Sequence, residues 1–199
     1  TDLEIVNVSS QGLPNDYTLL EWVESSGLQS LSLGFSGNCT IEFTVQMAHV
    51  PTSNEVLLTS NPYANAGTWF GVIYDNTWSY VDISGSTKVD VVMNATAQGL
   101  NGTVNGDTFS RNIPVTHGTW TLFNNIPPSS SSSTFPSFMK LFALKVTQNG
   151  VVIRNLVPCK NNNNVVGLYD TINNVFYSST SGTQLIAGTV IPTGKVINF

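Results

Sequence analysis

The amino-acid sequence predicts an all-β protein, folded as an antiparallel two-sheet β-sandwich of the jelly-roll type. Short runs rich in Val, Ile, Thr, Phe, Tyr and Trp recur about every ten residues, separated by Gly, Asn, Ser and Pro. No window has a convincing helical period of apolar residues. A sandwich or a barrel fits this pattern. Among sandwiches, the 199 residues favour a jelly roll, because an immunoglobulin domain needs only about 100.

The predicted strands follow one another along the whole chain. In Thr40–Val50 alternate residues are apolar, so one set faces the core and the other faces outward. The inward set is Ile41, Phe43, Val45 and Met47, and the outward set is Glu42, Thr44 and Gln46. Other strands are expected within Glu55–Ser60, Thr68–Asp75, Trp78–Ser84, Thr87–Ala95 and Thr119–Ile126, and Leu19–Ser25 suits a strand as well as a helix.

Tight-turn dipeptides divide the remaining strand-like segments into hairpins. Asn105-Gly106 and Asn149-Gly150 favour a two-residue turn, because both residues tolerate positive φ. The first lies within Leu100–Val115 and the second within Met139–Cys159. A third hairpin is expected about Asn173-Asn174, within Val165–Thr180, and a fourth about Asn76-Thr77. The low-complexity segment Pro127–Ser137 is expected to be a flexible surface loop.

The composition excludes several functional classes. Charged residues make up only 10% of the chain, so neutral polar groups must cover the surface. Seven basic residues and a net charge of −5 give no electrostatic footprint for nucleic acid. No run of 18 apolar residues predicts a membrane span, and no signal peptide is visible in the first residues.

The two cysteines, Cys39 and Cys159, are too few for a disulfide scaffold or a structural zinc site. Cysteine is among the most buried residue types, so two buried free thiols are expected. A disulfide between the two is the alternative that the sequence leaves open.

Two stretches carry a likeness to a known family. They are LPNDYTLLEWVESSG (Leu13–Gly27), and MKLFALKVTQNGVVIRNLVPC followed by VVGLYDTINNVFY, within Met139–Tyr177. Together they resemble the opening and closing of the laminin-G-like, concanavalin A-like lectin-glucanase jelly-roll domains. Such domains are common in surface proteins of gut bacteria and virion proteins of their phages. The segment Leu28–Leu33 departs from the family pattern.

The resemblance implies two stacked sheets with the first and last strands close together. It makes residues 1–12 an N-terminal arm and residues 13–199 a single jelly-roll domain. Pro158 would end a strand, and Tyr169 and Tyr177 would bury their rings with their hydroxyls at a polar rim. Core-facing and turn-flanking positions would be Leu141, Leu144, Val146, Val152 and Ile153.

The sequence shows no arrangement typical of catalysis. Glycoside hydrolysis needs two carboxylates about 5 to 9 Å apart, and no E-x-D-x-x-E or E-x-E run provides them on one strand. Glu21 and Glu24, three residues apart, would point to opposite faces of a strand. His49 and His117 have no neighbours at catalytic or zinc-ligand spacing. The protein is therefore predicted not to be an enzyme and to need no cofactor.

Calcium is the one metal that the sequence leaves open. Laminin-G-like relatives often hold Ca²⁺ at a loop rim through Asp, Asn and backbone carbonyl oxygens. The weak candidates here are Asp75, beside Asn76, and Asp170, near Asn173, although no D-x-D-x-D loop is present.

The segment Tyr63–Asp82 is rich in aromatic residues, which can stack on sugar rings while neutral polar side chains bond the hydroxyls. The candidate ligand-binding residues are Trp69, Tyr74, Asp75, Asn76, Trp78 and Tyr80. The alternative interpretation is that these aromatic rings fill the core or cover a sheet edge.

These observations lead to two functional hypotheses. The first is a non-catalytic, surface-displayed lectin-like module that binds a cell-surface glycan, in adhesion, on a phage virion or a bacterial surface. The second is a structural decoration or fibre protein of the virion, which is held in place by protein contacts and could be an oligomer. Its arm, Thr1–Gly12, would add a strand to a sheet of a neighbouring protein. Both place the protein extracellularly or on the virion surface. A glycoside hydrolase is a third hypothesis, which the missing acid pair disfavours.

Overall fold

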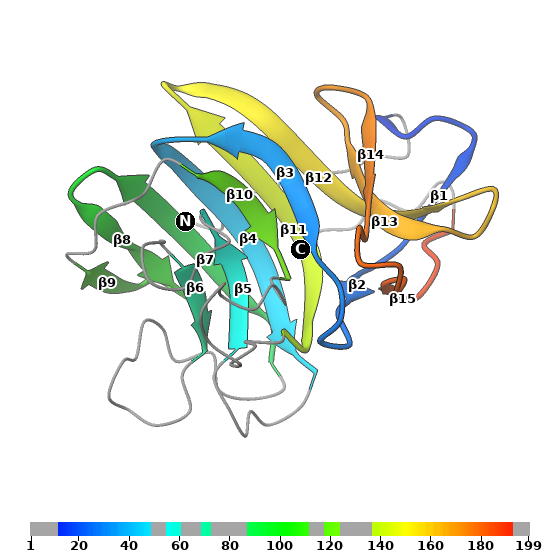
Figure 1. Cartoon of the computed structure of the whole chain (residues 1–199), viewed down its shortest axis with the longest axis horizontal. Helices are drawn as coiled ribbons and strands as arrows, with labels where there is room; N and C mark the ends of the chain where they lie inside the picture. Colours follow the sequence, from blue (N-terminus) through cyan, green and yellow to red (C-terminus); the bar gives the residue numbers. More distant parts are fainter. Residues whose placement is uncertain are drawn as a thin grey trace.

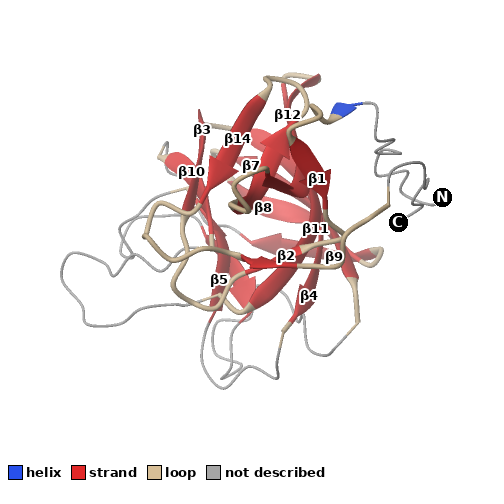
Figure 2. Cartoon of the chain, turned by 90° about the vertical axis from the view of Figure 1, so that its right-hand side faces the viewer, coloured by secondary structure: helices blue, strands red, loops and turns tan. Residues whose placement is uncertain are grey.

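The computed structural model describes residues 12–48, 55–60, 69–72, 87–111, 118–123 and 137–192, with only the backbone described at 69–72 and 111. These residues form two antiparallel β-sheets and no α-helix, apart from one short helical turn at Gly12 (Figures 1 and 2). The prediction of an all-β sandwich is therefore confirmed. The strands are β1 (Tyr17–Leu19), β2 (Val23–Glu24), β3 (Leu31–Ser36), β4 (Cys39–Met47), β5 (Glu55–Thr59), β6 (Trp69–Val72), β7 (Val89–Thr96), β8 (Gly99–Val104), β9 (Asp107–Arg111), β10 (Thr119–Leu122), β11 (Met139–Gln148), β12 (Val151–Asn161), β13 (Val166–Asp170), β14 (Val175–Ser178) and β15 (Ile186–Ala187).

The larger sheet has eleven strands and the smaller sheet has four. The main path of the larger sheet is β14-β13-β12-β11-β4-β7-β8-β9, and that of the smaller sheet is β3-β10-β5-β6. The last strand, β15, pairs with the second strand, β2, and Leu20, just after β1, forms a bridge with Val190, so the opening and closing segments of the described chain are neighbours. The resemblance implied that the first and last strands lie close together, and the described part of the chain agrees with this in the pairing of β15 with β2. No described helix is long and apolar enough to cross a membrane.

The main core lies between the two sheets and follows the alternation in the sequence. Ile41, Phe43, Val45 and Met47 of β4 are buried in it, as predicted. They face Leu31, Leu33 and Phe35 of β3 and Trp120 of β10, within the same core cluster. The opposite side of β4 differs from the prediction at Thr44, which is also buried. Its hydroxyl donates to the Asp90 carboxylate on β7 at 2.6 Å, which satisfies the buried polar group.

Three predicted hairpins are present, and their turn residues have the expected backbone. Asn105 and Gly106 have φ of 48° and 91°, and Asn149 and Gly150 have φ of 50° and 77°. Positive φ at both central residues is the signature of a type I′ turn, whose twist matches that of the flanking strands. Asn174 also has positive φ, in the turn between β13 and β14.

A second, smaller cluster lies beside β12 and β13, away from the main core. Its buried members are Val157, Cys159 and Tyr169, and the partly buried Leu13, Tyr17, Leu19 and Phe176 pack against them. The Tyr17 ring lies 4.8 Å from the Tyr169 ring and 5.3 Å from the Phe176 ring, between centroids. Cys39 and Cys159 are both buried free thiols, which agrees with the favoured prediction over a disulfide.

The closing segments follow the resemblance in part. Leu141, Leu144 and Val146 are buried, whereas Val152 is 37% exposed beside the β11–β12 turn. Pro158 does not end a strand: it lies inside β12, opposite Leu168 of β13. On its other edge β12 pairs with β11 up to Leu156 and with β1 from Cys159 onward, so Pro158 lies where the partner changes. A missing backbone donor is tolerated at such a changeover.

Candidate functional site

Most of the predicted ligand-binding residues lie outside the described residues. These are Tyr74, Asp75, Asn76, Trp78 and Tyr80, together with His49 and His117. Residues 1–11 of the predicted arm and residues 127–136 of the predicted loop also lie outside the described residues. Ser137, the last residue of the predicted loop, is described and is buried. Trp69 is described by its backbone alone, which pairs with Thr59 at the start of β6. β6 is the last of the described strands in the smaller sheet, and the aromatic-rich segment runs through it.

Several strand ends meet at one end of the sandwich, which we call the loop end. Met47 pairs with Met139, and Glu55 with Val72. The chain intervals 49–54, 73–86 and 124–136 each begin and end at strand ends of this kind. The predicted residues between 74 and 80 therefore belong to an interval that starts at the loop end. Binding residues on β-sandwiches commonly come from such connections, held by a rigid scaffold.

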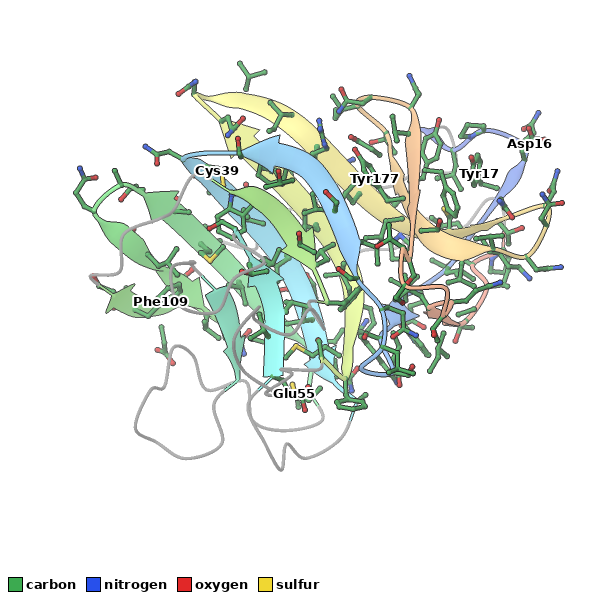
Figure 3. The ribbon with its side chains drawn as sticks, viewed as in Figure 1. Asp16, Tyr17, Cys39, Glu55, Phe109 and Tyr177 are labelled. Carbon is green, nitrogen blue, oxygen red and sulfur yellow. The ribbon has the colours of Figure 1, made fainter. Side chains whose placement is uncertain are left out.

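A buried carboxylate joins the two sheets at the loop end. Glu55, on β5 of the smaller sheet, is only 1% exposed (Figure 3). Its Oε2 accepts a hydrogen bond of 2.8 Å from the backbone N–H of Phe138, next to the first residue of β11 in the larger sheet. The hydroxyl of the neighbouring Ser137 is buried and has no hydrogen-bond partner among the described residues. The sequence predicted a strand at Glu55 but no role for its side chain. The only sign of such a role in the sequence is that a charged residue precedes a run of apolar residues.

A row of neutral polar side chains crosses the outer face of the larger sheet, the face directed away from the smaller sheet. Thr40 of β4 donates to the Asn94 side-chain oxygen of β7 at 2.8 Å, and the Asn94 amide donates to the Asn101 side-chain oxygen of β8 at 3.2 Å. We call Thr40, Asn94 and Asn101 the polar row. Asn101 is exposed, so its amide group is accessible at the end of the row.

The charges beside the polar row are paired with one another. Lys145 Nζ lies 2.8 Å from Glu42 Oε1, with both side chains about one-fifth exposed. Lys88 lies 3.3 Å from Glu21, and Lys140 lies 4.0 Å from Glu24. Three cations are thus matched by three carboxylates, and Asp90 of β7 adds one further carboxylate to the outer face, where it accepts the hydrogen bond from Thr44.

Two aromatic rings near these ion pairs are already covered. Lys140 Nζ stands 4.3 Å from the Trp22 ring centroid, and a Cβ at Gly188 would lie 2.6 Å from the same ring. Lys88 Nζ stands 4.1 Å from the ring centroid of the buried Phe142. Neither ring offers a free face for stacking on a sugar.

Asp170, the described calcium candidate, is a fully buried carboxylate with its oxygens occupied. Oδ2 lies 3.5 Å from Arg154 Nε and accepts a 2.7 Å bond from the Asn173 amide. Oδ1 accepts bonds from the backbone N–H groups of Asn155 and Ile172. This is a buried ion pair that organises a turn. The described residues contain no group of three or more His, Cys, Asp or Glu that could hold a metal ion.

No protein-family model and no curated protein matches the chain. One solved structure that is similar to part of it is a mutant of Trypanosoma rangeli sialidase that displays trans-sialidase activity. The identity is 15% and the TM-score 0.38, over 55% of this chain and 20% of that chain. The matched protein is an enzyme, so the prediction that this chain is not an enzyme is corrected and is not kept. A likeness of this strength transfers neither fold nor activity to the chain.

Proposed function

We propose that the protein is a surface-displayed lectin-like module that binds a glycan, in the manner of the laminin-G-like and concanavalin A-like domains that its opening and closing segments resemble. The setting we propose is extracellular, on a phage virion or a bacterial surface. The observation that carries the proposal is the polar row on a charge-paired face of a β-sandwich.

The chemistry of the polar row suits an uncharged sugar chain. Sugar hydroxyls both donate and accept hydrogen bonds, and so do Asn and Thr side chains. Neighbouring strands are about 4.8 Å apart, so Thr40, Asn94 and Asn101 repeat across the sheet at a short, regular spacing. The paired charges of Lys145 and Glu42 give no net attraction for a polyanion. We therefore expect a neutral polysaccharide rather than a sulfated one.

Stacking on the sugar rings is assigned to the aromatic segment, with Trp69, Tyr74, Trp78 and Tyr80 as the candidate rings and Asp75 and Asn76 as their polar neighbours. The support for this assignment is that Trp69 begins β6, which is the last described strand of the smaller sheet and leads to the loop end.

Affinity electrophoresis through gels that contain neutral host polysaccharides tests this function. We expect retardation of the intact chain, about tenfold weaker binding for Trp78→Ala, and no change for Asn163→Ala in an exposed turn. Each gel is run with added calcium and again with a chelator, which tests the calcium hypothesis. Absence of retardation in every neutral gel rejects the proposal.

A second candidate function is that of a virion decoration or fibre protein held by protein contacts. The observation that favours it is that Gly12, where the described chain begins, lies against Thr171, and the next residue, Ile172, exposes 48% of its apolar side chain. When particles are assembled in the presence of a truncated chain that lacks residues 1–11, the truncated chain should not be incorporated. Normal incorporation would reject a role for the arm.

A further inference from the structure

One corner of the described sandwich is built from chain segments without charged side chains. The segments are residues 30–38, 146–153 and 171–180, and none of them contains an Asp, Glu, Lys, Arg or His. The charged residues nearest to them along the chain are paired with one another. Glu42 bonds Lys145, and Asp170 bonds Arg154. We call the three segments together the uncharged corner.

Hydrogen bonds hold the three segments of the uncharged corner together. The Asn173 amide donates to the Ile153 carbonyl oxygen at 2.7 Å, which joins the β13–β14 turn to the start of β12. The Gln148 amide donates to the carbonyl oxygens of Ser36 at 2.8 Å and Asn38 at 3.1 Å, which joins β11 to the β3–β4 turn. The β11–β12 and β13–β14 turns both lie along the upper side of Figure 1. The segments therefore form one continuous surface.

The main chain of this corner is already hydrogen bonded within the molecule. β14 lies against β3, and the Thr180 N–H donates to the Ser30 carbonyl oxygen at 3.0 Å. Further along β3, Arg154 Nε donates to the Leu33 carbonyl oxygen at 3.2 Å. A partner at the uncharged corner would therefore contact side chains rather than add a strand.

Apolar side chains are exposed on the uncharged corner. Val151 is 63% exposed and Val152 is 37% exposed, at the start of β12. Ile172 is 48% exposed and Val175 is 42% exposed, in the β13–β14 turn and at the start of β14. The exposed polar side chains of the same segments are neutral, and they are Ser32, Ser36, Asn38, Asn149, Asn173 and Asn174. Apolar residues with a neutral polar rim are typical of protein–protein interfaces, whose centres are poor in charge.

The charge of the chain favours a second copy as the partner at this corner. With a net charge of −5, two copies repel each other in most orientations. A two-fold contact places the same patch of each copy against the other, so a charge within the patch would approach its own counterpart. The uncharged corner avoids this repulsion, because its segments contain no charged residue.

We propose that the uncharged corner is the contact surface between two copies of this chain, related by a two-fold axis. Val151, Ile172 and Val175 of each copy would be buried against the other copy, with Asn and Ser side chains bonding at the rim. The exposed apolar patch is small, so the dimer should dissociate on dilution. The inference goes beyond glycan binding and does not depend on it, and it gives the second candidate function a defined protein contact.

Analytical ultracentrifugation of the purified chain across a range of concentrations tests the proposal. We expect a monomer–dimer equilibrium, which Val151→Lys and Ile172→Lys should each weaken at least tenfold. Both side chains are exposed, so the circular-dichroism spectrum should not change. The matched control is Val190→Lys, because Val190 is 47% exposed but lies at the bridge to Leu20, beside Glu21. It should dimerise like the unaltered chain. A monomer at every concentration, or a dimer that tolerates both substitutions, overturns the proposal.

Salt and truncation distinguish this contact from others. Salt screens the repulsion between two negative chains and has no attraction to screen at the uncharged corner, so added salt should not weaken the dimer. A dimer that dissociates in salt would use a charged face, which overturns the proposal. Deletion of residues 1–11 should leave the dimer intact. Its loss would assign the contact to the arm and would also overturn the proposal. Absence of retardation in the polysaccharide gels would reject glycan binding alone.

Discussion

The guanidinium group of Arg154 and the buried carboxylate of Asp170 lie 3.5 Å apart and connect β12, β13 and β3. Arg154 also donates to the carbonyl oxygens of Leu33 at 3.2 Å and Ile153 at 2.7 Å. Its guanidinium carbon stands 5.9 Å from the Phe35 ring centroid. One side chain from a closing segment of the larger sheet thus fastens the first strand of the smaller sheet. This gives a structural reason for an arginine before Val-Pro-Cys and an aspartate after Gly-Leu-Tyr.

Asp170→Asn should destabilise the fold by about 3 kcal/mol, because it leaves the Arg154 guanidinium, 16% exposed, without its anion. Urea denaturation followed by tryptophan fluorescence measures the loss. Asp107→Asn, in an exposed residue of a hairpin, should change stability by less than about 0.5 kcal/mol. Equal effects of the two substitutions would show that the ion pair contributes nothing.

Gly167→Ala should also destabilise the fold, by about 1 to 3 kcal/mol. A Cβ at this residue would overlap the Tyr177 carbonyl oxygen and approach the Phe176 ring to 2.7 Å, so β14 would have to move. Gly12→Ala is the matched control, because its Cβ would make only an ordinary contact with Thr171. Thermal unfolding compares the two variants, and a melting temperature for Gly167→Ala equal to that of the control contradicts the expected overlap.

The two thiols should make the fold less stable at alkaline pH. Burial raises the pKa of Cys39 to about 12 and that of Cys159 to about 12, against the ordinary value of 9.0. Above about pH 9 the unfolded chain loses these protons while the folded chain keeps them, so the free energy of unfolding falls as pH rises toward 12. Below that range the contribution is complete.

Urea titrations at several pH values check this dependence against the double variant Cys39→Ala, Cys159→Ala, whose stability should fall less steeply. The folded chain should also resist a thiol reagent near pH 8 and react only after denaturant is added. Rapid labelling of either cysteine in the folded chain would contradict their burial.

Asn101→Ala should weaken binding of a neutral polysaccharide by about three- to tenfold, the effect of one lost hydrogen bond. The side chain is exposed, so stability should change by less than about 0.5 kcal/mol. Affinity electrophoresis beside Asn163→Ala gives the comparison. Unchanged binding, alongside a clear loss for Trp78→Ala, would place the glycan at the aromatic segment and away from the polar row.

Features set by local chemistry were predictable from the sequence. Alternation in β4 identified Ile41, Phe43 and Val45 as core residues, and Asn105-Gly106 and Asn149-Gly150 identified two hairpins. Each depends on residues close together in the chain.

Features set by strand pairing were not predictable. Thr44 is buried because β7 brings Asp90 beside it, and Pro158 is tolerated inside β12 because the partner strand changes there. The polar row likewise joins Thr40 to Asn94 across a pairing that no local pattern specifies. The same holds for Glu55, whose partner at Phe138 lies on the other sheet. The predicted aromatic residues were found from composition, and their arrangement stays a prediction.

The hydrogen bond between Glu55 and Phe138 has a practical consequence for engineering. Just before the interval 124–136, the Phe123 N–H donates to the Leu57 carbonyl oxygen at 2.8 Å. Just after it, the Phe138 N–H donates to Glu55 at 2.8 Å. Both flanks of the interval are therefore fastened to the same strand, β5. Since loop-closure entropy grows only slowly with length, foreign peptides grafted between these two anchors should leave the scaffold intact and be displayed from it.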